Sequence, residues 1–167
     1  DIRDFPSVEA VIDVVYNPLR TKLVCDALAH NIPAFGGLYM LVAQAAYASE
    51  LFTGEPVDPN QINKIFYELL FEKQNIVLIG MPGSGKTTVG AQLTKSLGRP
   101  FLDTDAIIEE RENCSIQDII TAKGEAYFRD LETAVIHRIA GEQHHVIATG
   151  GGAILRDENI THLRENG

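Results

Sequence analysis

Apolar residues along the chain form short continuous runs that alternate with longer segments at helical spacing. The short β-branched and aliphatic runs predict strands at 11–16, 76–79, 100–103 and 145–148. The helical spacing predicts helices at about 21–29, 38–52, 60–72, 89–97, 105–111, 115–122, 125–140 and 157–163. Because strands and helices alternate from residue 76 onwards, we expect an α/β fold with a parallel sheet and helices on both faces.

The two longest predicted helices of the first half differ in pattern. Segment 38–52 is apolar on nearly all sides, which predicts burial between layers, and it follows a glycine turn at Phe35-Gly36-Gly37. Segment 60–72 is amphipathic, and its predicted inward side chains are Ile62, Ile65, Phe66, Leu69 and Leu70.

A polar trio, Lys73-Gln74-Asn75, separates the two halves and predicts a boundary between domains at 1–73 and 74–167. The chain begins at Asp1 and stops just after a helical pattern, so we expect a piece of a longer polypeptide.

Charge and cysteine content narrow the classes of partner. The net charge is −9, and both halves are acidic, so we expect no nucleic-acid surface and no anionic membrane as partner. Cys25 and Cys114 form no C-x-x-C pair, which argues against zinc and against a disulfide framework and favours a reduced, cytoplasmic protein. No apolar run approaches the roughly 18 residues of a membrane span.

The most specific motif lies between the strand at 76–79 and the helix at 89–97. It reads Gly80-Met81-Pro82-Gly83-Ser84-Gly85-Lys86-Thr87, followed by Thr88, and it satisfies G-x-x-x-x-G-K-[ST]. In that setting backbone N–H groups and a helix N-terminus surround phosphate oxygens. We expect Lys86 to contact the β- and γ-phosphates of a nucleotide and Thr87 to offer its hydroxyl to Mg²⁺.

Three further features follow the predicted strands, where parallel α/β sheets bind ligands. Asp103 and Asp105 are alternate residues of a segment that we expect to be extended, so both carboxylates would face the phosphates, one holding Mg²⁺ through water and one accepting a hydrogen bond from an attacking hydroxyl. The alternative is that one of them only caps the next helix. Residues 150–152, three consecutive glycines, permit close approach of a ligand, or form an ordinary tight turn.

Arg129 could grip a substrate carboxylate through its guanidinium fork, or be an exposed helix arginine paired with Asp130 or Glu132. The third predicted strand ends in Thr149 rather than in the metal-binding acid that is typical of P-loop ATPases and GTPases. That absence favours a small-molecule kinase over a motor ATPase, a GTPase or a regulatory switch.

These motifs closely resemble the shikimate kinases from about Asn75 to the last residue: the P-loop, Phe101-Leu102-Asp103-Thr104-Asp105, Gly124-Glu125 followed by Phe128-Arg129, and Thr149-Gly150-Gly151-Gly152-Ala153. The resemblance implies Mg-ATP-dependent phosphorylation of the shikimate 3-hydroxyl. It assigns ATP to residues 80–88, Mg²⁺ to Thr87 and Asp103, and catalysis to Lys86, Asp105 and Arg129. It also implies that shikimate contacts the following residues: Asp105, Phe128, Arg129, Gly150, Gly151 and Gly152.

The lid arginine, a further shikimate-binding arginine and the adenine-binding loop of that family have no counterpart before Gly167. We therefore expect these 167 residues to be a poor kinase alone. Another small-metabolite P-loop kinase, or a catalytically silent nucleotide-binding module, remains an alternative.

The first half resembles the C-terminal end of shikimate dehydrogenase, on Asp13-Val14-Val15-Tyr16-Asn17-Pro18-Leu19, on Gly36-Gly37-Leu38-Tyr39-Met40-Leu41 with Gln44-Ala45, and on Phe52-Thr53-Gly54. That resemblance implies that Tyr16 and Gln44 touch shikimate and that Gly37 and Met40 lie near the nicotinamide of NADP. The two halves together predict a segment of a bifunctional enzyme of aromatic amino acid biosynthesis.

Overall fold

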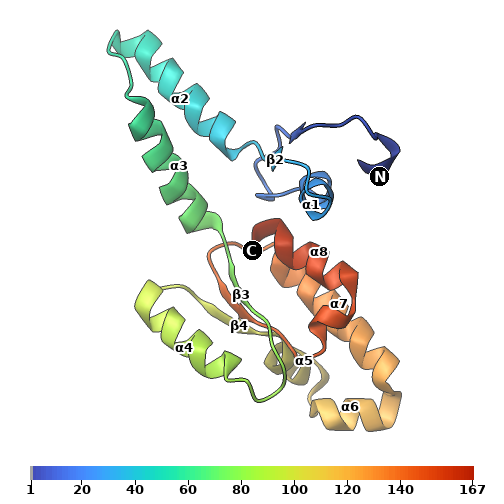
Figure 1. Ribbon diagram of the computed structural model, residues 1–167. Helices are drawn as coiled ribbons and strands as arrows, with labels where there is room; N and C mark the ends of the chain where they lie inside the picture. Colours follow the sequence, from blue (N-terminus) through green and yellow to red (C-terminus); the bar gives the residue numbers. More distant parts are fainter. Residues whose placement is uncertain (1) are drawn as a thin grey trace. The chain divides into compact units, whose positions relative to one another are not determined.

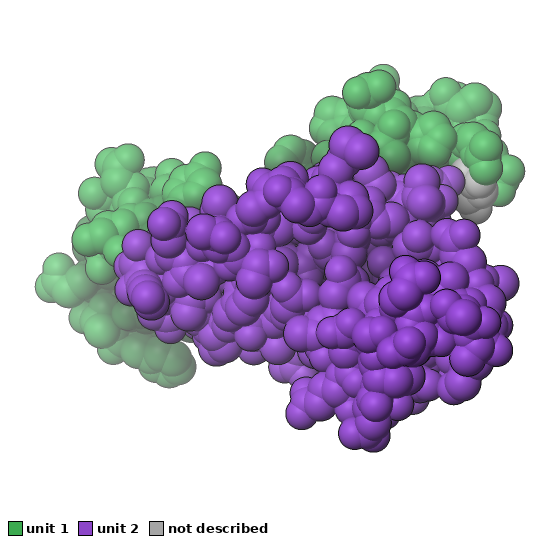
Figure 2. Space-filling view, turned by 90° about the horizontal axis from the view of Figure 1, so that it is seen from below, with its two compact units in different colours: residues 1–74 green, residues 75–167 purple. Residues whose placement is uncertain are grey.

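The computed structural model describes residues 2–167 and divides into two compact units, residues 1–74 and 75–167 (Figures 1 and 2). Each unit has its own secondary structure and is described by itself. In the described part of the chain, no helix is both long and apolar enough to cross a membrane.

The first unit pairs a very small sheet with three helices. Its elements are η1 (Ile2–Asp4), β1 (Val11–Ile12), α1 (Lys22–Ala29), β2 (Ala34–Phe35), α2 (Leu38–Thr53) and α3 (Pro59–Lys73). β1 and β2 are parallel, with Val11 opposite Ala34. The hydroxyl of Thr21 accepts a hydrogen bond from Val24 N and so caps α1, while Asp58 caps α3.

The strand predicted at 11–16 is shorter than expected, because β1 ends at Ile12. Asp13 explains the early end. Its Oδ1 accepts a hydrogen bond from Val15 N at 2.9 Å, and its Oδ2 accepts one from the Thr21 hydroxyl at 2.6 Å. Such local side-chain bonds compete with a strand ladder, so the chain turns towards α1. β2, which the sequence pattern did not reveal, pairs with the remaining two residues.

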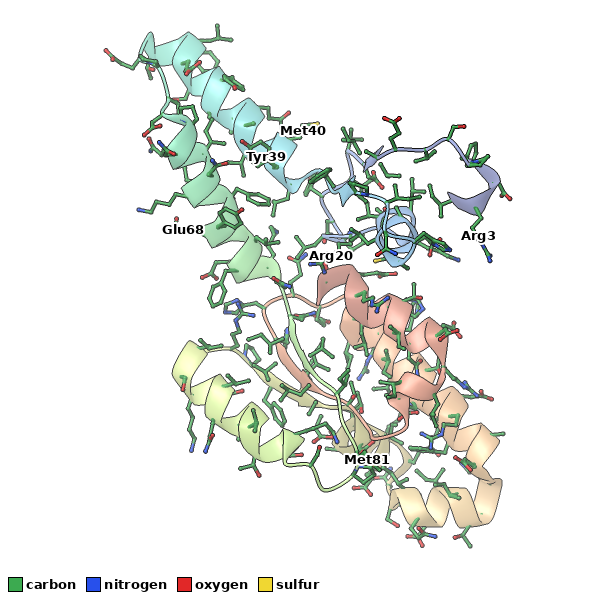
Figure 3. All side chains as sticks on the ribbon, viewed as in Figure 1. Arg3, Arg20, Tyr39, Met40, Glu68 and Met81 are labelled. Carbon is green, nitrogen blue, oxygen red and sulfur yellow. The ribbon has the colours of Figure 1, made fainter. Side chains whose placement is uncertain are left out.

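The predicted burial of α2 and α3 was wrong for most of their apolar residues, although Ile62 is buried as predicted. Only Leu38 and Val42 are buried on α2, and only Ile62 is buried on α3. Within this unit α2 packs mainly against α3, through contacts such as the edge-on rings of Tyr39 and Phe66. One neighbouring helix covers a single stripe of another, so the other apolar side chains stay at the surface. Figure 3 marks Tyr39 and Met40 near the start of α2.

The second unit is an α/β layer structure, as predicted. Its elements are β3 (Ile76–Leu78), α4 (Lys86–Leu97), β4 (Phe101–Asp103), α5 (Thr104–Glu112), α6 (Ile116–Lys123), α7 (Glu125–Ala140), β5 (Val146–Ala148), η2 (Ala153–Leu155) and α8 (Asp157–Asn166). The strands are parallel in the order β3-β5-β4. In Figure 1, α4 lies on one side of this sheet and α7 and α8 lie on the other.

The central strand β5 is the most buried part of this unit, with all three of its residues inaccessible to solvent. Ile147 contributes to a core whose other buried members come from α5, α6 and α7: Ile108, Ile119, Phe128, Val135 and Ile139. A smaller cluster of Ile136, Ala153 and Leu163 joins α7, η2 and α8. Helices on one face of the sheet are therefore fixed to the strand whose end carries the glycines.

Asn75 anchors the start of β3. Its buried side chain donates to the carbonyl of Glu142 at 2.7 Å and accepts from His145 N at 2.9 Å, while its backbone N–H donates to Asn166 O at 2.6 Å. The residue that we assigned to the boundary thus satisfies backbone groups of the α7–β5 connection and of the end of α8.

Gly90 lets α4 approach the sheet closely, because a Cβ at this position would collide with the ring of Phe101. We predict that Gly90→Ala lowers the thermal midpoint, since overpacking costs typically about 1–3 kcal/mol and outweighs the gain of roughly 1 kcal/mol in helix propensity. Ser96→Ala, at an exposed position of the same helix, is the matched control and should not lower the midpoint. A higher midpoint for Gly90→Ala would show that helix propensity dominates and that Phe101 yields freely.

Candidate active site

Three segments of the chain follow the carboxyl ends of the parallel strands. The register places Leu78 of β3 and Asp103 of β4 on either side of Ala148 of β5. The segments that follow these residues are the P-loop (residues 79–85), the start of α5, and the glycine loop (residues 150–152). Their convergence is the expected consequence of parallel pairing in an α/β sheet.

The P-loop leads from β3 directly into α4, and Figure 3 marks Met81 in it. Gly83 and Gly85 have φ angles of 75° and 83°, the left-handed region that glycine adopts without strain. A Cβ on either glycine would meet no atom within 4 Å, so both face open space at the N-terminus of α4. This is the open cradle of backbone N–H groups that suits phosphate oxygens.

Lys86 folds back over this loop, and its ammonium donates to the carbonyls of Gly80 at 2.8 Å and Met81 at 2.9 Å. The only fixed cation of the motif is thereby held at the mouth of the cradle. The remaining predicted phosphate contacts, Pro82, Ser84 and Thr88, are exposed residues of the same turn.

The first turn of α4, which follows the P-loop, is connected to β4 by a hydrogen bond in which the Thr87 hydroxyl donates to Asp103 Oδ2 at 3.0 Å. Two oxygen ligands of the kind that Mg²⁺ prefers are thus already adjacent, and Mg²⁺ commonly keeps several waters in addition. Among the described residues no group of three His, Cys, Asp or Glu side chains could hold a metal. The Thr87 hydroxyl and the Asp103 carboxylate thus offer two adjacent oxygen donors beside the P-loop.

The expectation that Asp103 and Asp105 share an extended segment was wrong, because α5 begins at Thr104. Asp103 is the N-cap of α5, and its Oδ1 accepts from the backbone N–H groups of Asp105 at 3.0 Å and Ala106 at 3.4 Å. The same carboxylate therefore caps the helix with one oxygen and holds Thr87 with the other. Asp105 lies in the first helical turn.

The three residues of the glycine loop are each needed for a different close approach. A Cβ on Gly150 would lie 2.6 Å from both Asp105 Oδ1 and Glu132 Oε1. A Cβ on Gly151 would collide with the ring of Pro82 in the P-loop, and a Cβ on Gly152 would collide with the guanidinium of Arg129. The glycine loop thus contacts the P-loop, the first turn of α5 and the first turns of α7.

Asp105 and Glu132 form an acidic pair beside Gly150. Asp105 Oδ1 and Glu132 Oε1 are both buried and have no hydrogen-bond partner within the described residues. Burial, and then the negative charges of Asp103 and Glu132, raise the pKa of Asp105, while Lys86 opposes that shift. A carboxyl group with a raised pKa and a free oxygen is suited to accept a proton or a hydroxyl hydrogen bond.

Arg129 lies between two glutamates of its own helix. Its Nη1 donates to Glu132 Oε2 at 2.9 Å and its Nη2 donates to Glu125 Oε1 at 3.1 Å. The sequence offered Asp130 or Glu132 as partners of an exposed arginine. The pair with Glu132 is formed, whereas Asp130 pairs with Arg156, and the side chain of Arg129 is only 20% exposed. The two glutamates accept from only two of the five N–H donors of the guanidinium, which leaves donors for a small carboxylate at the edge of the glycine loop.

Phe128, a predicted substrate contact, is only 4% exposed and belongs to the main core of the unit. The Arg129 guanidinium carbon lies 5.0 Å from the centroid of its ring. In the described structure this ring packs in the core and contacts the Arg129 guanidinium rather than facing an open pocket.

The predicted site residues of the first unit do not all line one cavity. Gln44 lines a cavity of about 750 Å³ between α2 and α3, whereas Gly37 and Met40 line a second one of about 420 Å³ with Phe35 and Tyr39. Tyr16 is 47% exposed and lines neither of these two cavities. The structure therefore does not bring Tyr16 and Gln44 together in one of them.

Two residues outside the predicted set of site residues contact it, of which Glu132 was named only as a possible partner of Arg129. Glu132, which is fully buried, fixes Arg129, and Thr104, also fully buried, accepts a hydrogen bond from Gly150 N at 2.9 Å through its Oγ1. The spacing of three residues between Arg129 and Glu132 on a helix was the available signal for the first. The second depends on the pairing of β4 with β5, which local sequence does not reveal.

Comparison with known proteins identifies relatives of both halves. Residues 82–167 match the family model "Shikimate kinase", and residues 37–64 match "Shikimate 5'-dehydrogenase C-terminal domain". The shikimate kinase of Symbiobacterium thermophilum is 52% identical over 93 residues, which cover 56% of this chain and 53% of that one. The shikimate kinase of a Synechococcus strain is 50% identical over 88 residues, which cover 53% of this chain and 47% of that one.

Solved structures agree with these matches. A shikimate kinase from Acinetobacter baumannii in complex with shikimate superimposes with a TM-score of 0.57 at 41% identity, over 60% of this chain and 56% of that one. The enzyme from Aquifex aeolicus gives a TM-score of 0.54 at 42% identity, over 56% of both chains.

The chain spans about half the length of the curated relatives it matches. The resemblance inferred from the motifs is confirmed, and so is the P-loop α/β fold of the second unit. Since the shikimate kinase model matches more than half of the 167 residues, the chain belongs to the shikimate kinase family.

Proposed function

We propose that the complete protein carrying this sequence phosphorylates the 3-hydroxyl of shikimate with Mg-ATP. The observation that carries the proposal is the glycine loop, whose missing side chains leave room for Pro82, Asp105 and Arg129 on its three sides. A phosphate cradle, a carboxyl base and a carboxylate-binding cation then border one short segment. The shikimate complex of the Acinetobacter baumannii relative supports the choice of substrate.

In this proposal each polar group has one task. Arg129 holds the substrate carboxylate, and the backbone of residues 150–152 lines the ring. The oxygen of the substrate hydroxyl forms a bond to the γ-phosphorus of ATP, and the bond from that phosphorus to the bridging oxygen of the β-phosphate breaks. Asp105 accepts the proton that the hydroxyl loses. The raised pKa of Asp105 suits this role, because a carboxylate with a raised pKa accepts a proton more readily than an ordinary one.

The residues around the P-loop fit ATP and Mg²⁺. Thr87 and Asp103 would hold the metal, and Lys86 together with the N–H groups of residues 83–88 would bind the phosphates. When bound, Mg²⁺ neutralises charge that develops on the transferred phosphoryl group. Lys86 would exchange its present bonds to the Gly80 and Met81 carbonyls for phosphate oxygens.

We further propose that the first unit is the end of an NADP-dependent shikimate dehydrogenase in the same polypeptide, on the basis of the match at residues 37–64. Phosphorylation would then follow the oxidoreductase step on a shared metabolite. The acidic net charge supports small-molecule substrates rather than nucleic acid. Cys25 and Cys114 are not joined in a disulfide, which supports a reducing, cytoplasmic setting.

A coupled assay of ADP release in the complete protein tests the kinase function. We expect shikimate-dependent turnover, and we expect Arg129→Ala to lower kcat/KM for shikimate by about 100-fold, because a buried charge-assisted contact to the substrate is lost. The KM for ATP should stay within about twofold.

The matched control is Arg138→Ala, at an exposed position of the same helix, which should leave all constants unchanged. Turnover with gluconate or another hydroxy acid, but not with shikimate, would contradict the substrate assignment. Turnover that is insensitive to Arg129→Ala would contradict the assigned role of that residue.

Asp105→Asn should separate activity from stability. The proposed base is removed, so kcat should fall by about 100-fold or more. Since the pKa of Asp105 is raised in the folded state, its ionised form destabilises the fold at neutral pH. In metal-free buffer at pH 7 the variant should therefore have a higher thermal midpoint than the parent protein.

That gain should disappear as the pH falls below the usual Asp pKa of about 4, where Asp105 is protonated in both the folded and the unfolded state. Thermal scans at pH 7 and pH 3.5 measure both points. A lower midpoint for Asp105→Asn at pH 7 would show that the ionised carboxylate is stabilised in the folded protein, contrary to this account.

A further inference from the structure

The glycine loop needs to be held at both ends if it is to keep Gly152 against Arg129. At its start, Gly150 N donates to the buried Thr104 hydroxyl, and Thr149 N donates to Leu78 O at 3.1 Å. At its end the chain passes through the single turn η2, in which Leu155 N donates to Gly152 O at 3.0 Å. The buried side chain of Asn159 donates to Ala153 O at 2.9 Å and ties η2 to α8.

Arg156 is the residue that fastens this end of the loop to α7. Its Nη1 donates to the carbonyl oxygen of Arg129 and to the Thr133 hydroxyl, both at 3.1 Å, and its Nη2 donates to Asp130 Oδ1 at 2.8 Å. The three acceptors lie on one turn of α7, the turn that also carries Glu132. The side chain is 35% exposed, and the Asp130 carboxylate is 74% exposed.

The partners differ in what they contribute. The Asp130 pair is open to water, and such pairs add little. The bonds to Arg129 O and Thr133 are partly buried, and they use the planar fork of the guanidinium, which is already organised for several acceptors. Arg156 therefore acts mainly through its bonds to Thr133 and to the backbone of Arg129, the residue whose side chain faces Gly152.

We propose that Arg156 is a positioning residue for the acceptor site: it holds the glycine loop and the Arg129 turn of α7 in fixed register, so that the Arg129 guanidinium stays against Gly152. This inference deepens the proposed function and rests on it. Arg156 itself would touch neither the nucleotide nor the acceptor. It would act on the affinity for the carboxylate-bearing substrate and leave the nucleotide side of the site unaffected.

The test compares Arg156→Gln, Arg156→Lys and the exposed control Arg138→Gln in the complete protein. We expect Arg156→Gln to raise the KM for shikimate by about tenfold, because small displacements of a binding group are costly, with the KM for ATP and kcat within about twofold. Arg156→Lys should recover part of the loss, since an ammonium can serve some of the three acceptors but lacks the fork. Arg138→Gln should behave like the parent protein.

A double-mutant cycle with Arg129→Ala adds a readout that a general loss of stability would not move. Without the Arg129 side chain there is nothing for Arg156 to position, so Arg156→Gln should add less than about a twofold change in shikimate KM in that background. Equal effects of Arg156→Gln in both backgrounds, or a parallel fall in kcat and in affinity for both substrates, would overturn the proposal and leave Arg156 as a purely structural contact.

A failure of the proposed kinase function can be distinguished from a failure of the positioning role of Arg156. If the parent protein shows no turnover with shikimate, the proposed function fails, and the positioning role is then judged by the NMR signal of the Arg129 side-chain Nε–H and the amides of residues 150–152. These signals should shift in Arg156→Gln and stay in place in Arg138→Gln. Unchanged signals in Arg156→Gln would overturn the proposal whatever the activity.

Discussion

The second unit depends on how closely a short backbone segment can approach its neighbours. After β5 the chain continues as three glycines, and a Cβ on any of them would collide with a different functional group: the carboxylates of Asp105 and Glu132, the ring of Pro82, or the guanidinium of Arg129. Parallel pairing with β5 in the centre brings these groups to one edge of the sheet. The glycines then allow them to meet without a side chain between them.

The charged groups at this edge of the sheet are placed beside the glycine loop at a cost to the stability of the fold. Arg129 is paired with a fully buried Glu132, and the free oxygens of Asp105 and Glu132 face the same glycine. Buried ion pairs seldom repay their desolvation cost, and two neighbouring carboxylates repel each other. A chain selected only for stability would not keep this arrangement. It is the pattern expected where a site trades stability for the binding of a charged ligand.

Sequence reasoning succeeded where local pattern and local chemistry coincide. The P-loop strand, its helix and the end of α4 at Gly98 could be predicted because glycines, an apolar run and helical spacing all indicated the same turn. It failed where long-range pairing decides. Thr104 contacts Gly150 only because β4 lies beside β5, and the apolar side chains of α2 are exposed because α3 is the main neighbour of that helix within its unit. Neither fact is encoded within one segment.

The two acidic residues after β4 show the same limit at a finer scale. Their spacing indicated a shared face on an extended chain, but Asp103 caps α5 with one oxygen and so forces Asp105 into the helix. Both residues still reach the site, Asp103 through Thr87 and Asp105 through Gly150. The residue types indicated carboxylates at this edge of the sheet, while the helix cap determines how each carboxylate is placed.

The most direct test of the central claim is an amide NMR titration of this chain with Mg-ADP and, separately, with shikimate. The account predicts that Mg-ADP shifts the amides of residues 80–88, and that shikimate shifts those of residues 150–152 together with the Arg129 side-chain Nε–H. Two separate sets of shifted signals, one in residues 80–88 and one in the glycine loop with Arg129, would support one site with a phosphate half and an acceptor half. Shikimate shifts confined to the first unit, or an absence of shifts in the glycine loop, would contradict it.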